Sequence, residues 1–185
     1  MTKKVIVVAH ALLLSLGSSA EAHRLDEYLQ ATLISIEADL FQAQLRLTPG
    51  VAVSSAVLAN IDTDSDAEIS ETEGRAYAEQ VLHDLSLTVD GDVVSLQLSS
   101  VEFPPAKLIT EGLGQIRLEF SGTLPPGPVK RTLVFENRHQ RRIAEYLVNC
   151  LVPRDPTIRI VAQHRNEQQS LYQLDYTAER ISTNL

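Results

Sequence analysis

Apolar and polar residues alternate along most of the chain, which is the pattern of half-buried β-strands. The alternation begins in residues 28–47, where a polar turn near residues 37–39 divides it into two paired strands. Segments rich in proline and glycine, at residues 125–128 and 153–156, separate the later stretches. We expect about nine strands with turns every roughly 8–12 residues, as in a β-sandwich. The later strands are expected at residues 85–89, 93–98, 115–121, 131–136, 144–152, 158–163 and 171–176.

Two local features refine this expectation. Asp90-Gly91 stands between two alternating stretches and predicts a tight hairpin turn. In the first two strands the large apolar residues are the expected core residues, and these are Leu33, Ile36, Leu40, Phe41, Leu45 and Leu47.

A pair of helices is expected to interrupt the strands between residues 53 and 85. Residues 53–61 are mainly small and apolar, which favours a short helix leading into an acidic stretch. Beyond that stretch, Ser70 and Glu73 have the spacing of a capping box, which marks the start of a second helix. Apolar residues then recur at helical spacing, namely Ala76, Tyr77, Val81, Leu82 and Leu85.

The acidic stretch runs from Asp62 to Glu73, with carboxylates at its positions 1, 3, 5 and 12. This spacing resembles the calcium loop of the EF-hand family, and the resemblance covers residues 53–85. Calcium takes about six to eight hard oxygen ligands, which alternate residues of a tight loop can aim at one point. The resemblance therefore implies Ca²⁺ as cofactor. The expected ligands are the side chains of Asp62, Asp64, Asp66, Ser70 (directly or through a water) and Glu73, with the backbone carbonyl of Glu68.

Two further residues of the loop and the residue directly after it bear on this interpretation. Ile69, at position 8, is expected to point away from the ion into apolar surroundings. Ala67 occupies position 6, where the family usually has glycine in a left-handed conformation, and this costs about 1–2 kcal/mol. Gly74 follows the last ligand and is expected to loosen the start of the second helix. The alternative is a solvated acidic turn, but six acids without a base would repel one another unless a cation joined them.

The N-terminus has the features of a secretory signal peptide. Lys3 and Lys4 precede an apolar run over residues 5–16, and small residues end in an Ala20-Glu21-Ala22 cleavage site. We expect cleavage after Ala22 and export to the periplasm or beyond, with residues 23–185 forming a single domain. No later segment is long and apolar enough for a transmembrane helix.

Charge and composition narrow the classes of function. Without residues 1–22 the chain has 14 bases and 23 acids, which argues against nucleic acid or anionic membrane as a partner. Cys150 is the single cysteine, so no intrachain disulfide can form, and we expect it to be a small buried residue. His139 lies in a polar cluster, residues 137–142, that we expect to be an exposed loop. No phosphate loop, nucleophile elbow or HExxH motif is present, so we do not expect an enzyme.

A second resemblance concerns three short segments, residues 23–30, 47–50 and 146–149. They resemble a family of bacterial exported proteins with one EF-hand-like loop, and the extracytoplasmic segments of membrane proteins related to nickel/cobalt permeases and to the HupE/UreJ family. A transport role would require a separate membrane transporter or other envelope protein as partner. His23 would be the mature N-terminal residue and could bind nickel, cobalt or copper through its amino group and ring.

The sequence therefore predicts a mainly β fold with a helical insertion (α+β), an antiparallel β-sandwich carrying one EF-hand-like helix–loop–helix. The expected function is that of an exported, non-catalytic calcium-binding module in which the ion is a structural clamp. The alternative is a periplasmic accessory domain for transition-metal transport that uses His23. An unrecognised hydrolase is a third hypothesis, for which the chain offers no nucleophile with a convergent base.

Overall fold

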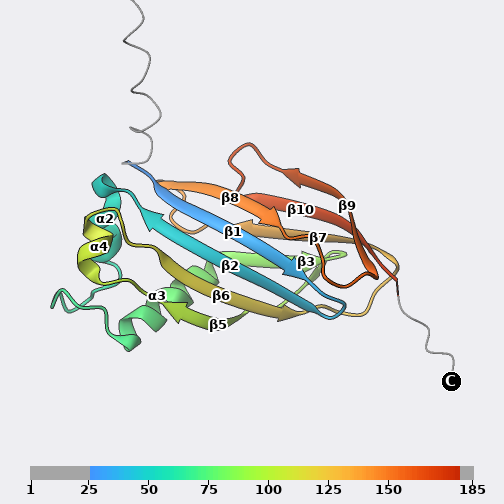
Figure 1. Cartoon of the computed structure of the whole chain (residues 1–185), viewed down its shortest axis with the longest axis horizontal. Helices are drawn as coiled ribbons and strands as arrows, with labels where there is room; N and C mark the ends of the chain where they lie inside the picture. Colours follow the sequence, from blue (N-terminus) through green and yellow to red (C-terminus); the bar gives the residue numbers. More distant parts are fainter. Residues whose placement is uncertain (1–25, 180–185) are drawn as a thin grey trace, which may run out of the picture.

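The computed structural model describes residues 26–179, in which ten strands form two five-stranded sheets (Figure 1). In the first sheet the strand order is β5-β6-β2-β1-β8, and in the second it is β4-β3-β7-β10-β9. The strands are β1 (Tyr28–Ile36), β2 (Leu40–Pro49), β3 (Leu85–Val89), β4 (Asp92–Val93), β5 (Gln97–Glu102), β6 (Ile116–Thr123), β7 (Lys130–Asn137), β8 (Ala144–Cys150), β9 (Ile158–Arg165) and β10 (Leu171–Ala178). The predicted signal peptide and His23 lie outside these residues.

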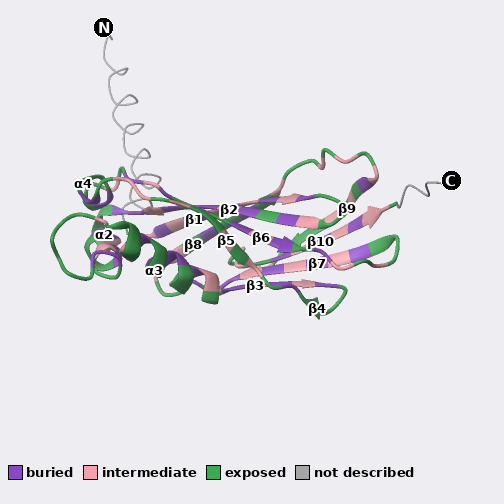
Figure 2. Cartoon of the chain, turned by 90° about the horizontal axis from the view of Figure 1, so that it is seen from below, coloured by how far each residue is buried: buried purple, intermediate pink, exposed green. Residues whose placement is uncertain are grey.

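The two sheets lie face to face as two layers (Figure 2), and their buried residues form one hydrophobic core. Side chains alternate between buried and more exposed positions along β1 and β2, as the period of a strand requires. The rings of Phe41 on β2 and Phe135 on β7 stack between the sheets, with centroids 6.1 Å apart. The predicted mainly β fold is therefore confirmed.

Two features of the sheets differ from the prediction. The expectation of entirely antiparallel sheets is wrong for one pair, because β8 runs parallel to β1. The single strand expected over residues 93–98 is also wrong, since β4 belongs to the second sheet and β5 to the first. The alternation of apolar and polar residues continues through residues 93–98, although the chain passes from the second sheet to the first within this segment.

Of the two core residues expected in β1, Ile36 is buried and Leu33 is not. Residues with even numbers from 28 to 36 are buried, so Gln30 and Thr32 point inward, while Leu33 is only partly buried. Ile36, Phe41, Leu45 and Leu47 are buried as expected, whereas Leu40 is partly exposed.

Helices α2 (Val51–Leu58), α3 (Glu71–His83) and α4 (Ala106–Thr110) lie at the same end of the two layers (Figures 1 and 2). The first two helices stand between β2 and β3, where the sequence predicts a helical pair. The alternating pattern did not predict α4, which packs on α2 through a hydrogen bond of 3.2 Å from the Ser54 hydroxyl to the Thr110 carbonyl. Within residues 26–179, no helix has the length and apolar character needed to cross a membrane.

Candidate functional site

The acidic loop, residues 62–73, begins after α2 and ends in the first turn of α3. Ser70 is the N-cap of α3, and its hydroxyl accepts a hydrogen bond from the Glu73 amide. The Glu73 carboxylate in turn accepts hydrogen bonds from the amide and hydroxyl of Ser70, at 3.0 and 2.7 Å. The predicted capping box is confirmed, and it fixes the Glu73 side chain beside the loop.

Three aspartates of the loop converge. One carboxylate oxygen each from Asp62, Asp64 and Asp66 can be chosen so that all three atoms lie within 4.8 Å of one another. Backbone amides orient them: Asp62 accepts hydrogen bonds from the amides of Asp66 and Ala67, at 3.2 and 3.0 Å. Oxygens gathered in this way can share one hard divalent cation.

The loop needs left-handed backbone at two positions. Ser65 has φ 61° and Ala67 has φ 66°, a region that costs a residue with a Cβ about 1–2 kcal/mol. The turn at Ala67 points its amide at Asp62, so the strained residue helps to orient the most buried carboxylate of the loop.

The Glu73 carboxylate also reaches back to the beginning of the loop. Its Oε1 accepts hydrogen bonds from the Thr63 amide at 2.7 Å and from the Thr63 hydroxyl at 3.1 Å. The hydrogen bonds from Ser70, and then those from Thr63, lower the pKa of Glu73 to about 2. Glu73 is therefore ionised next to the aspartates.

The negative charges of the loop act against the ionised form of one of its carboxylates, Asp64. Asp62 is only 7% exposed, and within the described residues no lysine, arginine or histidine forms an ion pair with a carboxylate of the loop. A hydrogen bond from the Asp66 amide favours ionised Asp64. Desolvation and the charges of Asp66, Glu73 and Asp62 outweigh it and raise the pKa of Asp64.

The other predicted positions of the loop have definite surroundings. The Glu68 amide donates to Asp66 at 2.8 Å, and Ile69 packs against the core, as expected for position 8. Gly74 is buried, and a Cβ at this position would lie 3.0 Å from the ring of Phe103. The glycine therefore allows a close approach of α3 to Phe103, and the expected loosening of the helix start stays a prediction. Ligation by the six predicted residues stays a prediction.

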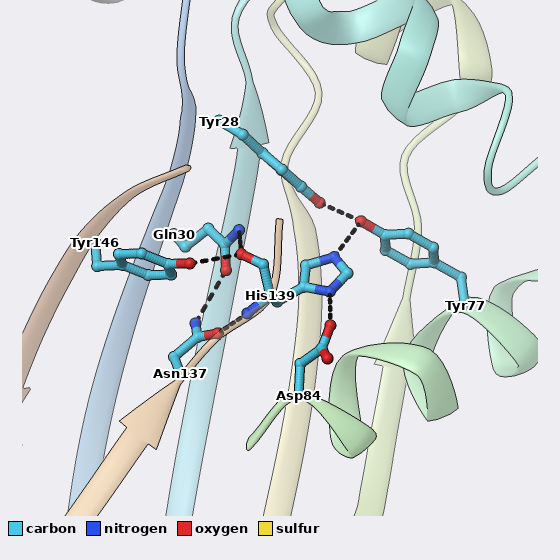
Figure 3. Close-up of polar contacts among 7 residues, drawn as sticks. All are labelled: Tyr28, Gln30, Tyr77, Asp84, Asn137, His139 and Tyr146. Atoms are coloured by element: carbon cyan, nitrogen blue, oxygen red, sulfur yellow. Dashed lines mark hydrogen bonds and ion pairs between the residues drawn. The ribbon is translucent and has the colours of Figure 1, made fainter. Parts of the chain in front are cut away.

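A buried polar network lies beyond the loop, and the sequence did not reveal it (Figure 3). His139 is 3% exposed, so the prediction of an exposed loop at this residue is wrong. Its Nε2 lies 3.0 Å from the Tyr77 hydroxyl, and its Nδ1 lies 2.8 Å from Asp84 Oδ2. The Tyr77 hydroxyl also lies 2.7 Å from the hydroxyl of Tyr28 on β1.

Side chains of three strands fix the backbone of His139. Its carbonyl accepts hydrogen bonds from Gln30 Nε2 at 3.0 Å and from the Tyr146 hydroxyl at 2.7 Å. Its amide donates to Asn137 Oδ1 at 2.9 Å, and Asn137 Nδ2 donates to Gln30 across the two sheets. The buried phase of β1 explains why Gln30 points inward.

Cys150 shows no activation. It is half-buried, and burial raises the pKa of its thiol to about 11. A thiol with this pKa is protonated at neutral pH, which agrees with the expected packing role.

Comparisons with protein-family models, curated proteins and solved structures give no match to this chain.

Proposed function

We propose that this chain is an exported calcium-binding protein whose acidic loop holds one Ca²⁺ as a structural clamp. The observation that carries the proposal is buried Asp62, which has no cationic partner among the described residues and lies close to two further carboxylates. A divalent ion would compensate these charges, and calcium prefers hard oxygen donors of this kind. The ligands would be Asp62, Asp64, Asp66, Ser70 and Glu73, with the carbonyl of Glu68.

The proposal treats α2, the acidic loop and α3 as an EF-hand-like insertion in a β-sandwich. It is supported by the backbone at Ala67, which has the left-handed conformation that favours glycine at position 6 of such loops. It is also supported by Ile69, whose side chain packs on the core instead of joining the carboxylates.

The positions of the proposed ligands in the sequence explain why the ion would act as a structural clamp. Asp62 lies four residues after the end of α2 at Leu58, whereas Glu73 belongs to the first turn of α3. One ion bound to both would fix the two helices relative to each other. A single loop has no second loop with which to build an opening groove, so a sensor role is disfavoured. An exported protein meets abundant calcium, for which a dissociation constant of about 10⁻⁴–10⁻³ M suffices.

Thermal unfolding during a calcium titration tests the proposal. The protein is first stripped with a chelator, and its melting temperature is followed as Ca²⁺ rises to several millimolar. We expect the melting temperature to increase with Ca²⁺ and to stay constant in sodium chloride of matched ionic strength. A melting curve unchanged by Ca²⁺ would exclude the calcium site.

The proposed export depends on cleavage after Ala22, which mass spectrometry of the protein from its native compartment would detect. Transition-metal binding through His23, with a separate membrane transporter as partner, concerns a residue outside the described ones. Calorimetry with Ni²⁺, before and after one residue is added ahead of His23, tests that alternative without involving the acidic loop.

A further inference from the structure

Outside the acidic loop, four side chains form a continuous series of polar contacts that joins α3 to the sheets. This tyrosine–histidine chain consists of Tyr28, Tyr77, His139 and Asp84, linked by contacts of 2.7, 3.0 and 2.8 Å (Figure 3). Tyr77 belongs to α3, and Asp84 is the C-cap of that helix. Tyr28 belongs to β1, and His139 follows β7, so the chain connects one helix with both sheets.

The hydrogen bonds of this chain have one consistent direction when His139 is neutral. Nδ1–H donates to the Asp84 carboxylate, which leaves Nε2 as an acceptor for the Tyr77 hydroxyl. The oxygen of Tyr77 can then accept the hydroxyl proton of Tyr28. Burial raises the pKa of both phenols, so both remain hydroxyls. Every proton in the chain has an acceptor.

A second proton on His139 reverses this direction. Both ring nitrogens then donate, so the Tyr77 hydroxyl can no longer donate to Nε2 and must accept from it. One of the two phenol protons is then left without an acceptor, because the described residues give these hydroxyls no partners other than each other and His139. Tyr28 and Tyr77 are both buried, so no solvent replaces the missing acceptor.

The charges around the ring do not compensate for this loss. Asp84 is the charged group that touches the imidazole, and its side chain is 44% exposed, so solvent weakens the pairing. Tyr146 contacts only the carbonyl of His139. On the segment of His139 itself, Glu136 forms ion pairs with Arg138 and Arg141. Burial lowers the pKa of His139, and the hydrogen bond and charge of Asp84 offset this only in part.

We propose that the tyrosine–histidine chain is a pH-sensitive latch that holds α3 on the two sheets while His139 is neutral and releases it when His139 takes up a proton. The unfolded chain would bind this proton near the ordinary histidine pKa of about 6.5. The contribution of the latch is therefore complete above that pH and is lost as the pH falls toward the lowered pKa in the folded protein.

The first test follows the imidazole of His139 by NMR between pH 8 and 5, with His83, an exposed residue of α3, as reference in the same spectrum. We expect the neutral tautomer that carries its proton on Nδ1, and titration of His139 below the ordinary histidine value of about 6.5. The opposite tautomer, or titration at or above pH 6.5, would overturn the proposal.

The second test measures release of the helix. Amide hydrogen exchange of the wild-type protein should show protection of α3 falling between pH 7 and 5 more than protection of β2, after correction for the intrinsic exchange rate. In His139→Gln, which cannot titrate, the selective loss at α3 should disappear, whereas the control His83→Gln should retain it. Equal loss in α3 and β2 of the wild type would contradict the latch, and this result does not require any variant to fold.

Discussion

The carboxylate of Glu73 lies 2.7 Å from the amide of Thr63, across the full length of the acidic loop. This contact joins the last predicted ligand to the second residue of the loop. It holds Glu73 close to the aspartates through hydrogen bonds of the protein alone. The same carboxylate caps α3. A substitution that tests ligation by Glu73 must therefore remove its negative charge and keep its capping hydrogen bonds.

Glu73→Gln makes that separation, because glutamine can still complete a capping box but cannot give a metal ion two charged oxygens. The variant should fold and lose the increase in melting temperature with Ca²⁺. At ten times the dissociation constant the wild type would gain about 1.4 kcal/mol from calcium. Calorimetry measures the dissociation constant for Ca²⁺, and thermal unfolding measures the stabilisation that Ca²⁺ provides.

Glu71→Gln is the matched control for this experiment. It removes one exposed charge from the same loop at a position that supplies no predicted ligand. Its response to Ca²⁺ should stay close to that of the wild type. Equal loss in both variants would mean that total charge, and not ligation by Glu73, determines the response.

Glu73 should also contribute to acid unfolding in the absence of calcium. Its pKa in the folded protein is about 2, whereas an ordinary glutamate titrates near 4.3. The stabilisation is therefore complete above the unfolded value and is lost as the pH falls through about 4 toward 2. In a chelator, Glu73→Gln should lose less stability than the wild type over this interval, as measured by urea unfolding at each pH. Parallel curves would contradict the role of its hydrogen bonds.

The capping box, the acidic loop and the hairpin turn were predictable because the residues that form each of them are close in sequence. Ser70 and Glu73 stand three residues apart, and the aspartates of the loop alternate, so spacing alone indicates how these side chains converge. The Asp90-Gly91 turn was predicted for the same reason, and both residues have positive φ.

The buried network could not be predicted, because its contacts join residues far apart in sequence. Tyr28 and Tyr77 are separated by 49 positions, and Gln30 and His139 by 109. The phase of β1 was ambiguous for a related reason, since large apolar residues such as Leu33 and Ile34 occur on both of its faces. The inward face also carries the polar residues Gln30 and Thr32, so hydropathy alone did not distinguish the two faces.

Removal of the central hydroxyl should weaken the latch. Tyr77→Phe takes away the acceptor of Tyr28 and the donor to His139, so two buried groups lose a partner. We expect a loss of about 1–3 kcal/mol in the free energy of unfolding. The double variant Tyr28→Phe/Tyr77→Phe should cost less than the sum of the single variants, because it also removes the stranded hydroxyl.

Tyr176→Phe is the matched control for that series. Its hydroxyl is buried and, within the described residues, has no hydrogen-bond partner. Removing it should leave the free energy of unfolding unchanged or slightly higher. Urea unfolding at pH 7.5 compares the variants. A loss in Tyr176→Phe as large as that in Tyr77→Phe would show that any buried hydroxyl is equally important.

Calcium binding and the latch should be linked if both proposals hold, because α3 carries Glu73 in its first turn and Tyr77 one turn later. Protonation of His139 would release the helix that positions Glu73 and thereby weaken calcium binding. The dissociation constant should then rise between pH 7.5 and 5.5 in the wild type and in His83→Gln, and rise less in His139→Gln. All three proteins carry the same ligand carboxylates, so protonation of these groups does not account for a difference between them. An equal rise in all three proteins would mean that the latch does not act on the loop, even where calcium binding and the titration of His139 both follow the proposals.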